Sequence, residues 1–358
     1  MESRGFMEKN LLLSFFLSVL SLTVGLSRAQ MVPAMFVFGD SLVDVGNNNY
    51  LPVSIAKADF PHNGIDFPTK KPTGRFCNSK NTADFLAEKL GLPSSPPYIS
   101  LSKKKDASSY INSVSFASGG AGIFNGTDQT FRQSITLSKQ VDNYIAVLKF
   151  LVQQMGPPST ENHLSKSLFT IVIGSNDIFD YFESSNLRKK NTLQQFVDLM
   201  AQTLKGQLKR LYEYGARKLV LTGIGAIGCV PEVRVENETH ECSEEHKFWS
   251  VRYNEGMKAM LKGLKSELQG INYSYFDTYS VMQNVIQKPS SYGTFELGDL
   301  KAKVPCVPVS MYCYNRNDHV FWDLYHPTEA TARVFVDNIF YGPSQYCIPM
   351  NVRQLVSV

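Results

Sequence analysis

A short run of bulky apolar residues, 34–38, ends abruptly at Gly39, Asp40 and Ser41. A run this short and this apolar is typical of a strand that is buried on both faces of a parallel sheet. Gly-Asp-Ser alone is also ordinary turn sequence. However, a serine just past the carboxyl end of a buried parallel strand lies where open α/β sheets bind their ligands. The run therefore favours an α/β fold and makes Ser41 a candidate for chemistry at the sheet edge.

The rest of the chain alternates short apolar runs with longer amphipathic segments. Further strands are expected at residues 109–117, 168–173, 218–222 and 273–277, and helices at 82–90, 134–153, 192–214, 244–268 and 327–340. Between Leu193 and Leu211 the apolar residues recur at three- and four-residue spacing, which indicates core packing rather than a cofactor site. The alternation predicts a doubly wound, mostly parallel, five-stranded sheet in a three-layer α/β/α domain.

The beginning of the chain is typical of a processing segment. Basic residues precede an apolar run over residues 11–26, and Ser-Arg-Ala at 27–29 supplies small residues for a signal peptidase. The apolar run is short for a stable membrane span. We therefore expect a signal peptide over residues 1–29, a single domain over 30–358, no transmembrane anchor, and secretion.

Sequons and cysteines agree with passage through an oxidising compartment. Three Asn-x-Ser/Thr sequons, at Asn125, Asn237 and Asn272, are candidate glycosylation sites. Six cysteines remain after signal removal, none in a Cys-x-x-Cys pair: Cys77, Cys229, Cys242, Cys306, Cys313 and Cys347. This pattern favours disulfides over a zinc site, and spacing does not choose the pairing.

The charge of the chain argues against a nucleic-acid partner. The net charge is only +4, and no basic tract is interleaved with aromatic residues. The oligomeric state is left open by the sequence.

A second group of chemistry-bearing residues lies near the other end of the chain. Asp323 and His326 are three residues apart, and Pro327 suits the first position of a following helix. A serine, a base and an orienting acid form a nucleophilic triad. In this triad Ser41 is the nucleophile, His326 the base, and Asp323 the group that holds the imidazole tautomer.

Two further stretches supply hydrogen-bond donors for an oxyanion. Gly119 lies in a glycine-rich loop after one expected strand, and Asn176 follows another. The N–H groups of Ser41 and Gly119 and the side-chain amide of Asn176 are the expected donors. The glycine-rich loop lacks the Lys-Ser/Thr of a phosphate-binding loop, and the chain lacks the Gly-x-Ser-x-Gly elbow of α/β-hydrolases.

Taken in order, these four blocks resemble those of the GDSL-type lipase/esterases, also called SGNH hydrolases. The strings FGDSLVDVGNNN, PTGRF and HPTE resemble the plant secreted branch, and the likeness runs over residues 34–341. The resemblance implies a flavodoxin-like strand order with the site at the carboxyl ends of the strands, and a location in the cell wall or apoplast. The chain departs from the plant pattern at His62-Asn63, where Pro-Tyr is more frequent, and at Ala226, where Pro is usual.

Together these features predict a secreted serine ester hydrolase, a GDSL esterase/lipase that needs no metal or organic cofactor. Its partner is expected to be an acyl ester, either a small molecule or linked to a polymer. An acyltransferase using the same triad with an alcohol acceptor stays open, as does a non-catalytic binding or defence protein on the same fold. The sequence does not choose between lipid, cuticle ester, acetylated polysaccharide and phenolic ester.

Overall fold

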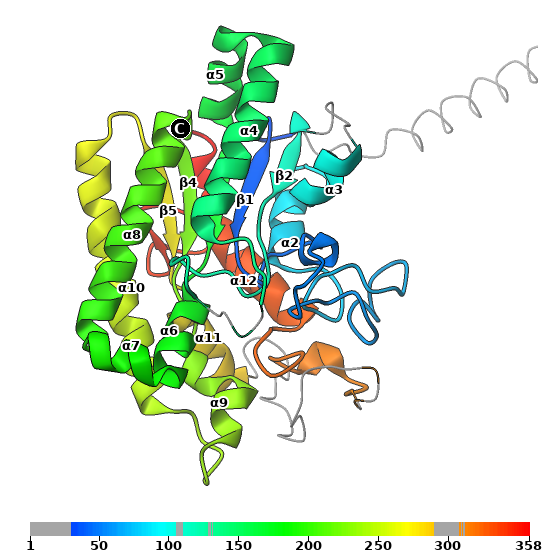
Figure 1. The fold of residues 1–358 in the computed structure, drawn as a ribbon, viewed down its shortest axis with the longest axis vertical. Coiled ribbons are helices and arrows are strands. Elements are labelled where there is room, and N and C mark those ends of the chain that lie inside the picture. Colours follow the sequence, from blue (N-terminus) through cyan, green and yellow to red (C-terminus); the bar gives the residue numbers. More distant parts are fainter. Residues whose placement is uncertain are drawn as a thin grey trace, which may run out of the picture.

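A twisted sheet with helices on both faces forms the centre of the protein (Figure 1). The computed structural model describes residues 30–104, 110–127, 130, 132–289, 308, 310 and 312–358. The expected signal peptide, Cys306 and most of the cysteine-bearing segment 290–314 lie outside the described residues.

Six strands pair in the order β2-β1-β3-β4-β5-β6, and the first five are parallel. Their bounds are Met35–Gly39 (β1), Ser113–Ser115 (β2), Leu168–Val172 (β3), Lys218–Thr222 (β4), Asn272–Phe276 (β5) and Cys347–Ile348 (β6). The order of the five parallel strands confirms the flavodoxin-like prediction. The prediction of five strands is wrong by one, because β6 adds a short antiparallel edge against Tyr275 and Phe276.

Successive side chains of β1 point to opposite faces of the sheet, because side chains along a strand alternate with a period of two. They therefore pack into two separate hydrophobic cores. Phe36 and Phe38 pack on one face, with ring centroids 5.5 and 6.0 Å from that of Tyr144. Met35 and Val37 pack on the opposite face. Both faces of β1 are therefore buried, which explains why the run is continuously apolar.

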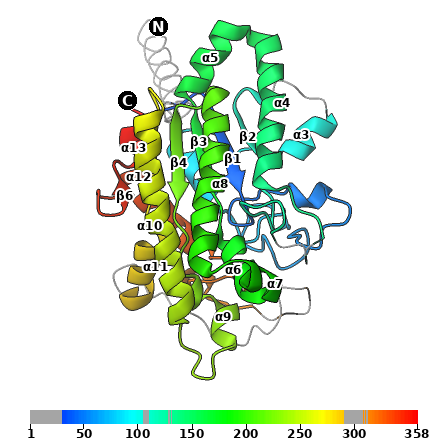
Figure 2. The ribbon, with the colours of Figure 1, turned by 60° about the vertical axis from the view of Figure 1, so that its left-hand side comes forward.

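Helices cover both faces of the sheet (Figures 1 and 2). One core is lined by α4 (Leu137–Met155), α8 (Leu193–Glu213) and α10 (Glu244–Glu267), and the other by α2 (Thr82–Lys89), α11 (Thr278–Gln287) and α12 (Glu329–Tyr341). Shorter helices are α3 (Tyr98–Lys104), α5 (Pro157–Lys166), α6 (Ser175–Glu183), α7 (Ser185–Lys190), α9 (Pro231–Val235) and α13 (Val352–Leu355), with 3-10 turns at Asn48–Tyr50, Ile227–Cys229 and Arg316–Asp318. This arrangement is the expected three-layer α/β/α architecture.

The helix expected from Pro327 begins two residues later, at Glu329. Thr328 is its N-cap, because the threonine hydroxyl accepts a hydrogen bond from the Thr331 N–H at 3.2 Å. Pro327 therefore belongs to the preceding turn rather than to the helix.

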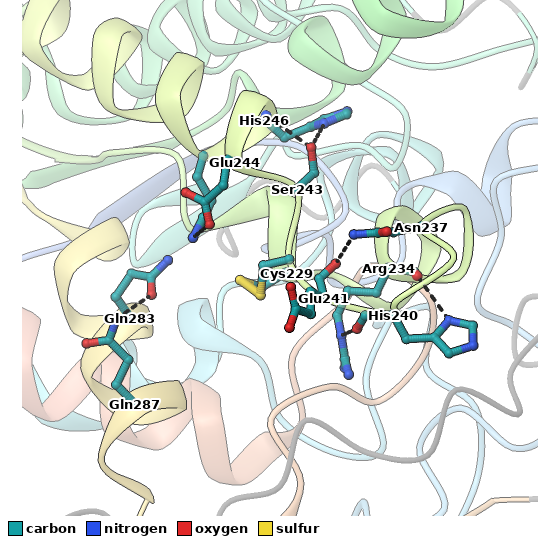
Figure 3. The surroundings of a disulfide bond; sticks show 12 residues. Cys229, Arg234, Asn237, His240, Glu241, Ser243, Glu244, His246, Gln283 and Gln287 are labelled. Atoms are coloured by element: carbon teal, nitrogen blue, oxygen red, sulfur yellow. Dashed lines mark hydrogen bonds and ion pairs between the residues drawn. A yellow bond between two sulfur atoms is a disulfide. The ribbon is translucent and has the colours of Figure 1, made fainter.

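One disulfide joins Cys229 to Cys242 (Figure 3). It closes the loop that precedes α10, so the expectation of disulfides is confirmed for this pair. Cys77 and Cys347 are buried thiols with no disulfide partner within the described residues, so the expected disulfides are not seen at these two positions. Cys313 is exposed and has no disulfide partner within the described residues.

The three sequons occupy different surroundings. Asn125 is exposed, Asn237 is partly buried in the loop after α9, and Asn272 is the first residue of β5. The Asn125 side chain accepts a hydrogen bond from Ser138 Oγ at 2.6 Å and that of Asn272 from Lys265 Nζ at 2.8 Å, and Asn125 is the most exposed of the three. Over the described part of the chain, no helix has both the length and the apolarity needed to cross a membrane.

Candidate active site

The carboxyl ends of neighbouring strands bring the predicted site residues together. Gly39, the last residue of β1, pairs with Val172, the last residue of β3. Ser41 follows β1 by two residues, and Asn176 lies in the first turn of α6, directly after β3. Because adjacent parallel strands end at the same sheet edge, residues far apart in sequence share one site.

Ser41, His326 and Asp323 form a continuous hydrogen-bonded chain. Ser41 Oγ lies 2.7 Å from His326 Nε2. On the other side of the ring, His326 Nδ1 lies 2.8 Å from both carboxylate oxygens of Asp323. Such a chain is the geometry that serine hydrolases use to activate a weak nucleophile.

A tight turn holds Asp323 beneath the imidazole. Asp323 Oδ1 accepts the backbone N–H of Tyr325 at 2.9 Å and that of His326 at 2.8 Å. Burial raises the pKa of Asp323, but the adjacent His326 and these N–H donors outweigh it and bring the pKa below its ordinary value. The carboxylate therefore stays ionised and favours the tautomer with hydrogen on Nδ1.

The imidazole is also packed from one side by Phe76. The two ring centroids are 5.0 Å apart, and His326 is only 9% exposed. Phe76 follows Arg75, whose guanidinium makes a buried bidentate pair with Asp84 at 2.6 and 2.7 Å. This ion pair fixes the loop that carries Phe76 to α2.

Gly119 is held by Asp44 and does not present a free donor. Its N–H donates to Asp44 Oδ2 at 3.1 Å, so the donor expected from the sequence is already occupied. A Cβ at this position would lie 2.6 Å from the Phe76 ring. The structure thus explains the glycine by the close approach of Phe76.

The next residue, Gly120, was missed by the sequence reasoning. It has a φ of 77°, which favours glycine, and it lines the hollow beside Ser41 and Asn176. Its N–H donates no hydrogen bond to any described residue, and the same is true of the Ser41 N–H. The only signal in the sequence was the Gly119-Gly120 pair, which does not say which N–H faces the site.

Residues at the start of α6 hold the segment that follows Gly120 through hydrogen bonds. Asn176 Nδ2 donates to the Ala121 carbonyl at 2.9 Å, which uses one of its two amide hydrogens. The buried carboxylate of Asp177 accepts the N–H groups of Ile123 (2.9 Å) and Phe124 (3.1 Å). One amide hydrogen of Asn176 therefore remains for a ligand.

Two loops beside the site are tied together across the sequence. Asp66 and Arg316 form a bidentate ion pair at 2.6 and 2.7 Å. Asn63, one of the two residues that depart from the plant pattern, accepts the indole N–H of Trp322 at 3.0 Å. The ring of the other departure, His62, lies against the ring of Tyr312 in the same segment, with centroids 4.5 Å apart and planes tilted by 50°. These contacts tie both departures to the segment that carries Trp322 and Tyr312.

Three buried carboxyl groups surround the site. Burial raises the pKa of Asp40 from its ordinary 3.8 to about 7, and those of Asp44 and Asp177 to about 6, although nearby N–H groups oppose the shift. Within the described residues, no group of three or more His, Cys, Asp or Glu side chains is placed to hold a metal ion.

These pKa shifts predict greater stability in mild acid. A carboxyl group with a raised folded-state pKa binds its proton more tightly in the folded chain than in the unfolded chain. Its contribution to the free energy of unfolding is therefore full below pH 3.8 and is lost as the pH rises toward 6–7. His163 and His246, whose pKa burial lowers, oppose this trend, but both are only partly buried. We expect a higher Tm at pH 5 than at pH 8 by circular dichroism.

The Asp40→Asn variant identifies the group responsible. Asp40 accepts one hydrogen bond, from the Leu42 N–H, and its Oδ2 has no partner among the described residues. The variant should flatten the dependence of Tm on pH, whereas Asp59→Asn, at an exposed position, should retain it. A Tm that rises from pH 5 to pH 8 in the parent chain would contradict this assignment.

Two hollows meet at Ser41. The first, which we call the inner cavity, extends from Ser41 over the carboxyl ends of β3, β4 and β5 toward α11 and α12. The second, the outer cleft, is lined by the loop residues Lys57, Phe60 and Asn63 among others. Ser41, Asn176, Phe179, Tyr325 and His326 line both.

A flavodoxin-like sheet with this chain of hydrogen bonds at its carboxyl edge has the architecture and geometry of an SGNH-type serine hydrolase. Residues 35–339 match the family described as GDSL-like Lipase/Acylhydrolase. The chain is 51% identical over 340 residues to a GDSL esterase/lipase of Arabidopsis thaliana, covering 91% of this chain and 90% of the relative. A second Arabidopsis thaliana GDSL esterase/lipase is 36% identical over 314 residues, covering 85% and 87%.

The chain therefore belongs to the GDSL-like lipase/acylhydrolase family and is a carboxylic ester hydrolase. Among solved structures, it is similar to Axe2, an acetylxylan esterase from Geobacillus stearothermophilus. That similarity has 12% identity and a TM-score of 0.38, and it covers 86% of this chain and 93% of the other. It is too weak to carry an argument about substrate.

Proposed function

We propose that the protein is a secreted serine ester hydrolase that works through Ser41, His326 and Asp323. The contact that carries this proposal is the 2.7 Å approach of Ser41 Oγ to His326 Nε2. Ser41 Oγ attacks the ester carbonyl while His326 takes its proton, and His326 then protonates the leaving alcohol. Water attacks the acyl-enzyme in the second half, giving its proton to His326, which returns a proton to Ser41 as the acid leaves.

Three donors are proposed for the oxyanion. The Ser41 N–H and the second amide hydrogen of Asn176 keep the roles expected from the sequence. For the third donor the proposal moves from Gly119 to Gly120, because Asp44 occupies the Gly119 N–H, whereas the Gly120 N–H has no hydrogen-bond partner among the described residues and Gly120 lines the outer cleft. Asp44 then acts indirectly, by holding the glycine turn in place.

Asn176→Ala should lower kcat by about a hundred- to a thousand-fold, the usual loss for one oxyanion donor. KM should change little, since the interaction strengthens as negative charge develops in the transition state. Steady-state kinetics on a short acyl ester measures both values. An unchanged kcat with a raised KM would make Asn176 a substrate-binding residue instead.

Hydrolysis is separated from acyl transfer by product analysis. Purified enzyme is incubated with an ester in water and then with glycerol as an added acceptor, and the acid and any new ester are quantified by chromatography. A hydrolase releases one acid per ester cleaved under both conditions. Accumulation of glycerol ester in place of the acid would identify an acyltransferase using the same triad.

For the compartment, we propose removal of residues 1–29 and export of residues 30–358 as a single hydrolase domain. The apolar segment, the exposed Asn125 sequon and the Cys229–Cys242 disulfide support this. Intact-mass analysis of the plant-expressed protein should find a chain beginning near Gln30, with N-glycan mass and an oxidised Cys229–Cys242 pair. An uncleaved, unglycosylated and fully reduced chain would contradict the proposal.

A further inference from the structure

Gln140 is a fully buried polar residue that the proposed mechanism does not use. It lies near the start of α4, is 0% exposed, and stands outside the four sequence blocks that predicted the site. Its side-chain oxygen accepts the Gly39 N–H at 2.8 Å, and its side-chain nitrogen donates to the Gly39 carbonyl at 2.8 Å. One side chain therefore binds both backbone polar groups of the last residue of β1, two residues before Ser41.

The Gln140 amide takes the place of a strand residue that is absent. β2 ends at Ser115, which pairs with Val37, so no residue of β2 pairs with Gly39. The Ser118 N–H reaches the Gly39 carbonyl at 3.0 Å, and the Gln140 amide supplies the acceptor for the Gly39 N–H. A primary amide carries an acceptor and donors side by side, as a peptide group does. It therefore satisfies a buried strand end that would otherwise lose a hydrogen bond.

The second amide hydrogen of Gln140 locks the orientation of the side chain. Gln140 Nε2 also donates to the Ile135 carbonyl at 2.7 Å, and the Ile135 N–H donates to Ser118 Oγ at 2.9 Å. Asn48 accepts a hydrogen bond from Ser118 Oγ and donates one to the Gly119 carbonyl at 2.8 Å. All of these side chains are buried. The network therefore joins the end of β1 to the turn that contains Gly119.

The position of Ser41 depends on these neighbours. The Ser41 N–H donates no hydrogen bond to any described residue, and the Ser41 hydroxyl is bonded to His326. The adjacent Asp40 N–H donates to the end of β3 at 3.1 Å. Just before it, Gly39 is held by Gln140. The backbone that carries the serine is thus fixed from β3 on one side and from α4 on the other.

We propose that Gln140 is a positioning residue for ester hydrolysis, which holds the end of β1 so that Ser41 Oγ stays within reach of His326. This role rests on the proposed function, because it requires Ser41 to be the nucleophile. A displaced backbone at this point would move the nucleophile and one proposed oxyanion donor, the Ser41 N–H, together. Both groups act on the transition state, so the loss should fall on kcat rather than on KM.

Asn254 is a matched control at the same edge of the sheet. Its side chain on α10 is 4% exposed, accepts the Ile224 N–H at 2.8 Å and donates to the Ile224 carbonyl at 2.8 Å. Ile224 follows β4 by two residues and belongs to neither the proposed triad nor the proposed oxyanion donors. Asn254 therefore holds a strand end through the same pair of hydrogen bonds without positioning the nucleophile.

The test compares Gln140→Met with Asn254→Leu, which each remove one amide and keep the approximate size of the side chain. Gln140→Met should lower kcat for an acetyl ester about a hundredfold, the effect of a displacement of about 1 Å at a reacting group, with KM within about twofold. Labelling of Ser41 by an organophosphonate should slow by a similar factor. Asn254→Leu should lower Tm but keep kcat within about twofold. Gln153→Met, exposed on α4, should keep the parental Tm and kcat.

Gln140→Glu keeps the length of the side chain and serves as the test if Gln140→Met does not fold. An ionised glutamate can accept the Gly39 N–H but has no hydrogen for the two carbonyl groups that face it, whereas a protonated one recovers a donor. The ratio of its kcat to the parental kcat should therefore rise as the pH falls. Dividing by the parental value at each pH cancels the dependence that both enzymes share. Asn254→Asp should give a ratio that does not change with pH.

The outcomes separate this role from the proposed function. A folded Gln140→Met with kcat and labelling within about twofold of the parent would overturn the positioning role, as would equal losses of kcat in Gln140→Met and Asn254→Leu. If Gln140→Met does not fold, a Gln140→Glu ratio that is constant with pH has the same consequence. A parent enzyme that hydrolyses no ester and takes no label at Ser41 would instead overturn the proposed mechanism itself.

Discussion

Ser41→Ala, His326→Ala and the double variant are expected to share one low residual rate, on the order of a million-fold below the parent kcat. In the proposed mechanism, the 2.7 Å contact between Ser41 Oγ and His326 Nε2 makes the two side chains a single proton-transfer unit. Once either is removed, the other has nothing left to contribute, so the losses do not add. Steady-state or single-turnover assays on a short acyl ester measure the three rates.

Matched variants control for general effects of substitution. Ser266 lies on the exposed face of α10, and His240 lies in an exposed loop. The variants Ser266→Ala and His240→Ala should therefore retain parental activity. Thermal unfolding should show that the site variants remain folded. If His326→Ala kept substantial activity that the second substitution then removed, the two residues would act separately and the unit would be refuted.

Asp323→Asn should lower kcat about ten-thousand-fold with little effect on the fold. The Asp323 carboxylate accepts a hydrogen bond from His326 Nδ1–H, which leaves Nε2 free to take the Ser41 proton. An amide in its place can donate to Nδ1 and stabilise the opposite tautomer. Asp318→Asn, the same substitution in the 3-10 turn of the same segment, is the control. A kcat for Asp323→Asn comparable to that of the parent would contradict the role of Asp323 in orienting the His326 imidazole.

The fold was largely predictable because its determinants are local. The strands β1, β3 and β4 are short, mostly apolar runs, and the long helix α8 carries an apolar stripe that keeps its phase. The β6 strand was missed because it has only the two residues Cys347 and Ile348, too few to show a period. It exists because a distant strand, β5, offers an unpaired edge.

The hydrogen-bonded chain of Ser41, His326 and Asp323 was predictable for a similar reason. Asp323 and His326 belong to one turn, and their spacing already places both side chains together. Ser41 was linked to them by the position of a strand end and by the family resemblance. The proposed oxyanion donor at Gly120 was harder to predict, because the Gly119 N–H is taken by a contact with Asp44, 75 residues away in the sequence.

The packing around the imidazole could not be deduced from the sequence either. Phe76 reaches His326 only because the buried pair of Arg75 and Asp84 draws its loop onto α2. The same approach forbids a side chain at Gly119. The sequence predicted an oxyanion donor at this glycine, and the structure adds a steric requirement that the sequence did not show.

Covalent labelling with an organophosphonate ester tests the central claim most directly, because only an activated serine reacts at a useful rate. The account predicts one label per chain, located on Ser41 by peptide mass spectrometry, with loss of ester hydrolysis in step with labelling. Ser41→Ala should take no label, and His326→Ala should react very slowly. A Ser41→Ala protein that still takes the label and hydrolyses esters at the parental rate would contradict the account.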